Sequence, residues 1–499
     1  MKRSMEVRFL RVRFGEANAR NLVLMAALSL VLAGGICLDN EEIAVLEPAK
    51  RVSVVNDVDV AVAGGGINGV FAAIAAARMG ARTVLIERFE SLGGVAGPGI
   101  NPGGGVQMPG RSAWEEFKRG STPYPYVWIF PEIAGLPREF ALKLQDLTGP
   151  RWNSLERSNA FSYLCTKMAV DAGVSLLLST YVCDPILEES TIRGLYVEGK
   201  SGRQAVKARV VIDATGEADV ARRAKVRFLS PKESYFELDS HAPNGIGIWA
   251  YVAGINWEKY ESSIQSGHSR LKFRPHQVGD LAQVQISEPE SGAALTKIEP
   301  GLGGMKVQLV RPHAKVDAGN ILHMSQLQAA VRIYIFEAVQ EIRRSEPGCE
   351  NAYLVAIAPY LGIRGGPCIE GEYTLTMDDC LSGRRFDDVI YLYGENRVLQ
   401  KTCATGSCVW ADVPYRVMVP KNLKGLLAVG RSASGIPDTL LRNRTAVQHM
   451  GEAAGIAAAM AAKSGTSPGS IDVKGLQRRL LDAGYYLGTD ERLRQLGLR

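Results

Sequence analysis

The hydrophobic pattern of the chain is clearest between Asp57 and Glu87. A short Val-rich run, VDVAVAG, is typical of a buried parallel strand. It is followed by a glycine-rich turn, by an alanine-rich helix that ends at Gly80, and by a second apolar run, TVLIE. The pattern therefore predicts one strand–helix–strand unit of about 30 residues with parallel strands.

Apolar periodicity predicts further elements along the chain. Between Val174 and Asp219, several stretches alternate polar and apolar residues and are separated by turn residues, which predicts strands. Gln326–Arg344 has helical periodicity, residues 425–430 (GLLAVG) form another buried-strand run, and Thr445–Lys463 is a long helix of small residues. Residues 231–320 are rich in Ser, Pro and Gly, so we expect an irregular part of an inserted domain there.

The first forty residues differ from the rest. Leu22–Gly35 is an uncharged apolar run, shorter than the about 20 residues that span a membrane, and a basic stretch precedes it. This order is typical of a signal peptide. We predict a signal peptide or membrane anchor over residues 1–40 and an exported or membrane-anchored protein. A misassigned start and a cytoplasmic chain are the alternative.

Composition and charge exclude several classes of protein. The chain has 499 residues, of which 46% are hydrophobic and 22% are charged, so it is not intrinsically disordered. The net charge is +6, but residues 1–20 hold six basic and two acidic side chains, which leaves only +2 for the remainder. Nucleic-acid binding therefore gains no support. Eight cysteines are too few for a disulfide scaffold, and without HExxH or CxxC spacing we predict no metal site.

A dinucleotide-binding motif lies between the first strand and the first helix. Gly64, Gly66 and Gly69 form GxGxxG, and Glu87 ends the next strand. The first glycine permits the tight turn, the second admits a pyrophosphate to the backbone, and the third lets helix and strand pack closely. Glu87 would accept hydrogen bonds from adenosine ribose hydroxyls and would repel a 2′-phosphate, which disfavours NADP. The alternative is a glycine-rich turn in another kind of α/β protein.

Further glycines distinguish FAD from NAD. Several of them, beginning with Gly93 and Gly94, follow the acidic residue, and a plain NAD domain has no need of them. The segment GGGINGVFAAIAAARMGARTVLIERFESLGG resembles the opening of the FAD-dependent oxidoreductases related to fumarate reductase flavoproteins and glutathione reductase.

Three later segments carry the same resemblance. VVIDATGEADVARRA resembles a motif that passes close to the nucleotide half of the cofactor, and GLLAVGRSASG resembles the strand that reaches its ribityl chain. MGEAAGIAAAMAA resembles a closing helix whose N-terminus points at the flavin and stabilises negative charge on its reduced form. The resemblance implies FAD as cofactor, bound by Gly64, Gly66, Ile67, Asn68, Gly69, Glu87, Arg88, Gly93, Gly94, Ala214, Thr215, Gly216, Gly430, Arg431, Gly451 and Ala454.

One position of the late motif departs from the family pattern. In many relatives the late motif ends in Gly-Asp, and the acid binds a ribityl hydroxyl. Here Arg431 follows Gly430. The acidic contact is therefore absent or comes from elsewhere in the chain.

The catalytic candidates also follow from the resemblance. LGIRGGPCIEGEYTLTMDDCLSGRRFDD and WADVPYRVMVP resemble a large bacterial group of these oxidoreductases, and they contain Arg364 and Arg416. Arginine binds a carboxylate with two parallel hydrogen bonds, and His449 could act as acid or base near neutral pH. The alternative is that these are surface or ion-paired residues. Cys403 and Cys408 are spaced like a redox pair, but they lie far later than in flavin disulfide reductases.

We therefore predict an α/β fold, with a Rossmann-like FAD-binding domain that combines a parallel sheet with an antiparallel meander. This domain would be discontinuous, comprising residues 55–230 and 355–465. An inserted α+β substrate domain would cover residues 231–354, and a helical tail residues 470–499. The expected activity is hydride transfer between a small organic substrate and flavin N5. A flavin monooxygenase or halogenase, and a non-catalytic FAD-binding subunit of a redox or surface complex, are the alternatives.

Overall fold

The structure is a computed structural model that describes residues 45, 47–100, 133–149, 155–229, 246–267, 275–286, 293–310, 316–363, 366–393, 410–435, 441 and 443–499. The chain divides into two compact units between Arg51 and Val52, and every helix and strand below belongs to the second. The predicted leader, Arg364 and the Cys403–Cys408 pair lie outside the described residues.

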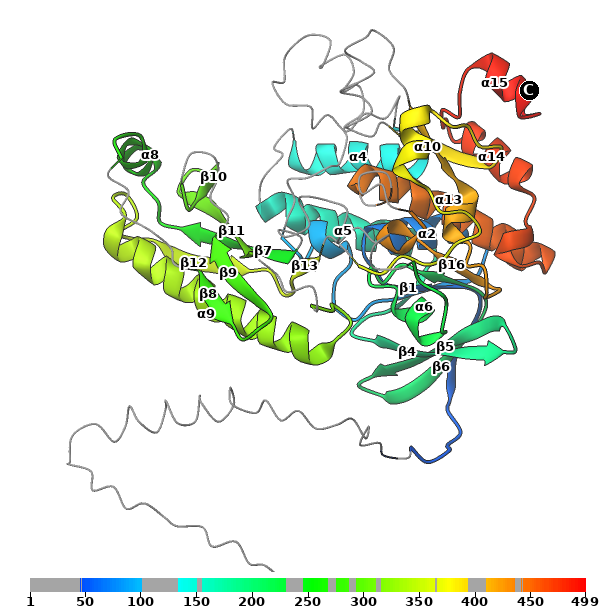
Figure 1. Ribbon diagram of the computed structural model, residues 1–499, viewed down its shortest axis with the longest axis horizontal. Helices are drawn as coiled ribbons and strands as arrows, with labels where there is room; N and C mark the ends of the chain where they lie inside the picture. Colours follow the sequence, from blue (N-terminus) through cyan, green and yellow to red (C-terminus); the bar gives the residue numbers. More distant parts are fainter. Residues whose placement is uncertain are drawn as a thin grey trace, which may run out of the picture. The chain divides into compact units, whose positions relative to one another are not determined.

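The first sheet has a parallel core and an antiparallel extension (Figure 1). Its order is β3-β2-β1-β6-β5-β4, with β16 also paired to β6. The parallel strands are β1 (Val54–Ala63), β2 (Thr83–Ile86), β3 (Ser175–Leu177), β6 (Gly202–Asp213) and β16 (Leu426–Ala428). β4 (Tyr181–Glu188) and β5 (Thr191–Gly199) continue from β6 as an antiparallel meander. This sheet confirms the predicted Rossmann-like α/β class.

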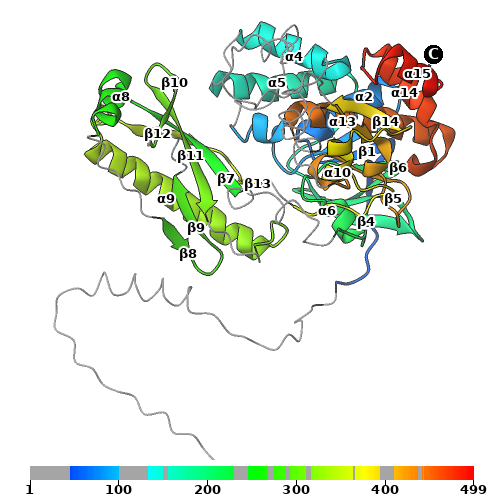
Figure 2. The same cartoon turned by 45° about the horizontal axis from the view of Figure 1, so that its top comes forward.

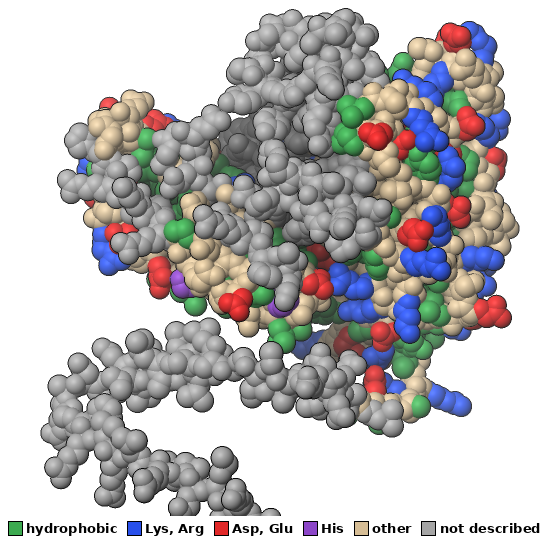
Figure 3. Space-filling model, in the orientation of Figure 1, with side chains coloured by type: hydrophobic (Ala, Val, Ile, Leu, Met, Phe, Trp, Pro, Cys, Tyr) green, Lys and Arg blue, Asp and Glu red, His purple; other side chains and the backbone are tan. Residues whose placement is uncertain are grey.

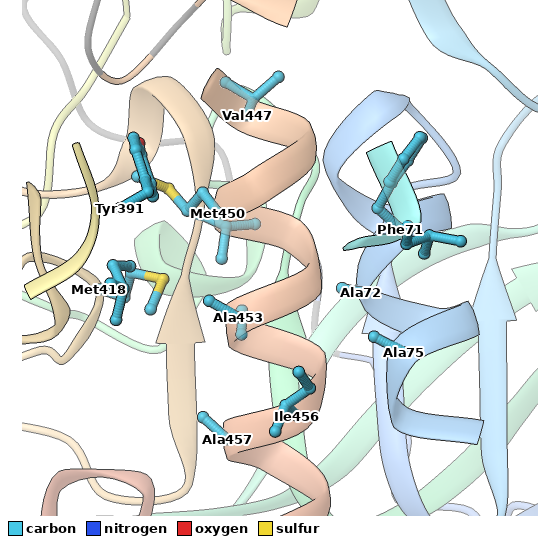
Figure 4. Packing of buried hydrophobic residues seen from close by; sticks show 14 of the residues in the cluster. Phe71, Ala72, Ala75, Tyr391, Met418, Val447, Met450, Ala453, Ile456 and Ala457 are labelled. Atoms are coloured by element: carbon cyan, nitrogen blue, oxygen red, sulfur yellow. The ribbon is translucent and has the colours of Figure 1, made fainter. Parts of the chain in front are cut away.

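Two helices from opposite ends of the chain pack together over this sheet. α2 (Ile67–Arg78) follows β1, and α13 (Arg444–Ser464) comes near the end of the chain. A Cβ atom built on Gly455 would lie 2.2 Å from the backbone oxygen of Ala72, so the close contact requires glycine there. On its other side α13 packs near Tyr391 of β14 (Val389–Tyr393) and Met418 of η4 (Tyr415–Met418) (Figure 4). α4 (Gly135–Thr148) and α5 (Leu155–Asp171) complete this layer.

The second sheet is antiparallel and has its own hydrophobic core. Its order is β12-β7-β11-β9-β8, with β10 on β11 and β13 on β7. The long helix α9 (Ile321–Ser345) lies along it in both views (Figures 1 and 2). The bounds are β7 Ile246–Ala253, α8 Trp257–Gln265, β8 His276–Val278, β9 Ala282–Ile286, β10 Thr296–Glu299, β11 Leu302–Val310, β12 Tyr353–Ile357 and β13 Gly362–Ile363.

This second sheet corrects two expectations. Residues 231–320 were expected to be irregular, but the described part of this stretch contains five strands. The strands β7 and β9 alternate buried and more exposed side chains. The insertion was expected to end at residue 354, whereas β12 and β13 extend the same sheet to Ile363. α9 also begins earlier than the predicted helix, since the Asn320 side chain accepts hydrogen bonds from its first N–H groups.

The remaining elements are short. They are η1 Gly94–Ala96, α6 Asp219–Arg223, α10 Met377–Ser382, β14 Val389–Tyr393, β15 Ala411–Pro414, η4 Tyr415–Met418, η5 Gly430–Ser432, η6 Pro468–Ser470, α14 Val473–Asp482 and α15 Asp490–Gln495. The tail expected as one helix is thus two, because Gly484 and Gly488 between them have positive φ angles. Arg492 on α15 pairs with the fully buried carboxylate of Asp412, which holds the tail against the main body.

Candidate FAD site

The glycine loop at the end of β1 has the geometry that a pyrophosphate needs. Gly64 has φ +96°, and a Cβ there would lie 2.6 Å from the backbone oxygen of Ala214. Gly69 is closer still, since its Cβ would lie 1.8 Å from the oxygen of Gly64. A Cβ on Gly66, in contrast, would meet nothing within 4 Å. Gly66 is the N-cap of α2, and no side chain caps that helix. The loop therefore presents uncapped helical N–H groups beside open space, which favours an anionic ligand.

Glu87 lies against this loop. Its Oε2 accepts a hydrogen bond from the backbone N–H of Gly65 at 2.6 Å, and its Oε1 accepts one from Phe89 N–H at 3.0 Å. Burial raises the pKa of this carboxyl group, and the two backbone hydrogen bonds partly offset that shift. These contacts fix the carboxylate at the end of β2, where the sequence placed a ribose acceptor.

The second glycine cluster is also in contact with the loop. Gly94 has φ +54°, and a Cβ there would lie 3.0 Å from the Cα of Gly66. Tyr360, which follows β12, stacks on Phe89 with ring centroids 4.7 Å apart, and the Arg88 guanidinium lies over both rings. Nothing in the sequence marked Tyr360, because its partners lie far away along the chain.

The motif after β6 meets the late motif after β16. Gly216 has φ +84°, and a Cβ there would lie 3.2 Å from Nη2 of Arg431. Arg431 forms an ion pair with Glu217, whose side chain is 9% exposed. Burial raises the pKa of Glu217, while Arg431 and Arg88 oppose the shift. The structure therefore joins Ala214, Gly216, Gly430 and Arg431 in one place, together with a carboxylate that sequence reasoning did not single out.

Asn68 connects this cluster to α13. With its amide oriented to satisfy both ends, Asn68 donates to the Val447 oxygen at 2.6 Å and accepts from Gly430 N–H at 2.9 Å. The side chain thus holds α2, η5 and α13 together. A contact of Asn68 with the cofactor would therefore come from its backbone N–H at the start of the helix.

The closing helix differs from its expected arrangement. Gly451 and Ala454 were expected to contact FAD near a helix N-terminus, but α13 begins at Arg444 and its first N–H groups bond to the Asn443 side chain. A Cβ on Gly451 would lie 2.5 Å from the backbone oxygen of Asn68, and Ala454 is fully buried. Both residues therefore serve the packing of α13 in the core, because small side chains allow close approach there.

Arg416 is held by an acidic partner. Its Nε and Nη2 lie 2.9 and 3.1 Å from the two carboxylate oxygens of Asp388, and its guanidinium lies over the Tyr373 ring. Mixed charges are general on the described part of the face shown in Figure 3, where Lys and Arg side chains lie among Asp and Glu side chains. These contacts match the ion-pair alternative for Arg416 better than the predicted binding of a substrate carboxylate.

His449 lies in the core. Its Nδ1 is 2.7 Å from the Thr445 oxygen, its Nε2 faces Ala134 N–H at 3.4 Å, and its ring packs edge-on against Tyr485. Burial lowers the pKa of His449 to about 4. A neutral, 1% exposed ring with both nitrogens engaged is poorly placed to exchange protons with a substrate.

Glu452 lies three residues further along α13 and is also buried. Its Oε2 accepts hydrogen bonds from Leu136 N–H at 3.0 Å and from the Tyr485 hydroxyl at 2.7 Å. Burial raises the pKa of Glu452 to about 7. The carboxyl group therefore ties α4 and the C-terminal tail to α13.

Two other features concern the part of the chain that the structure describes. None of its helices is long and apolar enough to cross a membrane. Within the same residues no cluster of His, Cys, Asp or Glu side chains could hold a metal ion.

Sheet, glycine cradle and acidic strand end together define a dinucleotide-binding protein of the Rossmann class. The FAD dependent oxidoreductase family matches residues 59–480, and the chain belongs to that family. Its cofactor is FAD, and it is an enzyme. The open cradle at Gly66 and the carboxylate at Glu87 fit such a cofactor.

Relatives among known proteins match part of the chain. A thiamine thiazole synthase of Methanococcus maripaludis strain C6 is 27% identical over 216 residues, which are 42% of this chain and 70% of that protein. A digeranylgeranylglycerophospholipid reductase of Methanoculleus marisnigri is 30% identical over 199 residues, 39% of this chain and 47% of that protein.

Solved structures match over more of the chain at lower identity. A geranylgeranyl bacteriochlorophyll reductase-like protein of Thermoplasma acidophilum has a TM-score of 0.40 and 14% identity, covering 86% of this chain and 84% of that one. The myxobacterial chondrochloren halogenase has a TM-score of 0.39 and 14% identity, covering 89% of each chain.

Proposed function

We propose that this FAD-dependent oxidoreductase transfers a hydride between a small organic substrate and N5 of the bound flavin. The observation that carries the proposal is the meeting of four loops at the carboxyl ends of β1, β2, β6 and β16, which is where open α/β sheets bind their ligands. FAD supplies the redox chemistry, and the protein supplies binding, orientation and electrostatics.

The residues of the chain divide these tasks. Backbone N–H groups at Gly66 and the start of α2 would hold the pyrophosphate, and Glu87 would accept hydrogen bonds from ribose hydroxyls. Tyr360 and Arg88 lie beside this half of the site and would shield it from water. Burial raises the pKa of the Tyr360 phenol well above its usual value, so the group keeps its proton and can only donate or accept a hydrogen bond.

We infer that His449 does not transfer the proton, because its ring is enclosed by Thr445 and Tyr485. Arg364 stays our candidate for binding a substrate anion, because its segment resembles a flavin-facing part of the family. The matched reductase from Methanoculleus carries a name that fits reduction of an organic substrate, which supports this class of reaction.

Anaerobic screening tests the proposal. Candidate substrates are added to the FAD-loaded protein without oxygen, and bleaching of the flavin absorbance is followed. A substrate that bleaches the flavin and is recovered in oxidised form supports hydride transfer. Oxygen is then admitted to the reduced protein. A reduced flavin that consumes oxygen rapidly and hydroxylates or halogenates the substrate would instead favour a monooxygenase or halogenase. A reduced flavin that reacts with no small molecule would favour a non-catalytic subunit.

We further propose that residues 1–40 export the protein or anchor it to a membrane, because a basic stretch precedes the apolar run Leu22–Gly35. Mass spectrometry of the N-terminus of protein purified from its native cell tests this. A chain that lacks this segment, or that sediments with membranes, is expected. A soluble cytoplasmic chain that begins at Met1 would contradict it.

A further inference from the structure

Glu217 has one carboxylate oxygen in an ion pair and another that lacks a partner among the described residues. The residue is 7% exposed, and its Oε1 pairs with Nη2 of Arg431. Its Oε2 is buried and has no hydrogen-bond partner among the described residues. A buried carboxylate oxygen left without a donor is costly, so such an atom in a native fold calls for a partner.

Two glycines border this ion pair. A Cβ on Gly216 would lie 3.2 Å from Nη2 of Arg431, and a Cβ on Gly366 would lie 3.3 Å from Oε2 of Glu217. Both glycines have positive φ angles, +84° and +156°. The backbone therefore approaches the ion pair closely from two sides, and Arg431 fixes the direction of the Glu217 carboxylate.

The strand order places this pair on one side of the glycine cradle. β1 carries the cradle, with β2 on one side and β6 on the other, and β16 also pairs with β6. Glu87 ends β2, whereas Glu217 and Arg431 follow β6 and β16. The loop that carries Glu87 and the loop that carries Glu217 therefore follow strands on opposite sides of β1. This arrangement favours the flavin half of the cofactor for Glu217, and not the nucleotide half that the resemblance of its motif implies.

We propose that Glu217 accepts hydrogen bonds, through Oε2, from hydroxyl groups of the chain that joins the pyrophosphate of FAD to its flavin ring. Arg431 is a positioning residue that holds the other oxygen. The inference rests on FAD as the cofactor and not on the reaction, so its tests use binding alone. Glu217, in the loop that follows β6, would thus supply the acidic contact that is missing from the late motif, where Arg431 stands in place of the acid.

Titration of the apoprotein with FAD and with ADP separates the two halves of the site. Glu217→Gln keeps the size of the side chain and removes its charge, so FAD should bind about tenfold more weakly, while ADP affinity should stay unchanged. Glu87→Gln should weaken FAD and ADP alike. Glu188→Gln makes the same change in an exposed Glu–Arg pair and serves as the matched control.

A measurement on the wild-type protein keeps the test independent of folding. FAD whose ribityl hydroxyls are replaced by hydrogens should bind the wild type more weakly than FAD, and Glu217→Gln should weaken that analogue no further. Equal loss of FAD and ADP affinity in Glu217→Gln would overturn the proposal, as would unchanged FAD affinity. An analogue that binds the wild type as tightly as FAD would also overturn it.

Discussion

Two buried groups on α13 should add opposite slopes to the dependence of stability on pH. Glu452 and His449 lie within one helical turn of each other, and both contact Tyr485. Burial moves their pKa values in opposite directions, to about 7 for Glu452 and to about 4 for His449. Arg78 and Glu139 also act on Glu452, but the loss of water contact is the largest cause.

The signs of the two effects are opposite. The unfolded chain releases the proton of Glu452 near its ordinary pKa of 4.5, whereas the folded protein keeps it to about 7, so stability falls as the pH rises between these values. The unfolded chain protonates His449 near 6.5, whereas the folded protein resists protonation down to about 4, so stability rises with pH in that window. Between pH 4.5 and 6.5 the two slopes therefore largely cancel.

Replacement of one group exposes the slope of the other. A shift from 4.5 to about 7 corresponds to about 3 kcal/mol of stability lost by neutral pH. Glu452→Gln retains an oxygen that can accept from Leu136 N–H and the Tyr485 hydroxyl, but it cannot ionise. We expect this variant to be more stable than the wild type above pH 7, by up to about 3 kcal/mol, and to gain stability between pH 4.5 and 6.5.

Chemical unfolding of the apoprotein at a series of pH values, followed by circular dichroism, measures this difference. Glu341→Gln, at an exposed pair with Arg344, is the control and should follow the wild-type profile. A Glu452→Gln profile parallel to that of the wild type from pH 4.5 to 8 would refute the reasoning, since it would mean that the carboxyl group is ionised in the folded protein throughout.

Three further outcomes are expected. Gly66→Ala should leave the melting temperature of the apoprotein unchanged but abolish retention of FAD on a desalting column, because its Cβ enters the open cradle. Gly69→Ala should lower the melting temperature itself, since its Cβ would lie 1.8 Å from the Gly64 oxygen; equal melting temperatures in the two variants would contradict this contrast. Arg416→Lys should cost about 1 kcal/mol or less in chemical unfolding, because the pair with Asp388 is partly exposed, and should leave FAD content normal; loss of FAD would contradict the assignment of Arg416 to a structural ion pair.

The sequence predicts most of the cofactor-binding half of the fold because its signals are local. The turn between β1 and α2, the C-terminal glycine of α2 and the apolar run of β16 each lie within a few consecutive residues. The second sheet escaped prediction because its strands pair across long separations and are divided by stretches rich in Ser, Pro and Gly: β7 pairs with β11 and β12. Such pairing leaves little trace in a single sequence.

The candidate catalytic residues could not be judged from sequence for a related reason. Arg416 and Asp388 are separated by 28 positions, and the Ala134 N–H that faces His449 by 315. Helical periodicity indicates that α13 is buried, but it does not identify which strand, loop or tail covers each side chain. In the sequence Glu217 is one acidic residue of its motif among others, and only the structure shows that Arg431 lies beside it.

The pairing of α2 with α13 has a consequence for biosynthesis. The cofactor loop is synthesised early, but the helix that supports it, Arg444–Ser464, leaves the ribosome only when the chain is almost complete. Until then the small apolar face of α2 has no α13 against which to pack, and the cradle lacks its rigid support. We therefore expect FAD to be captured only after α13 has been synthesised, late in the production of the chain.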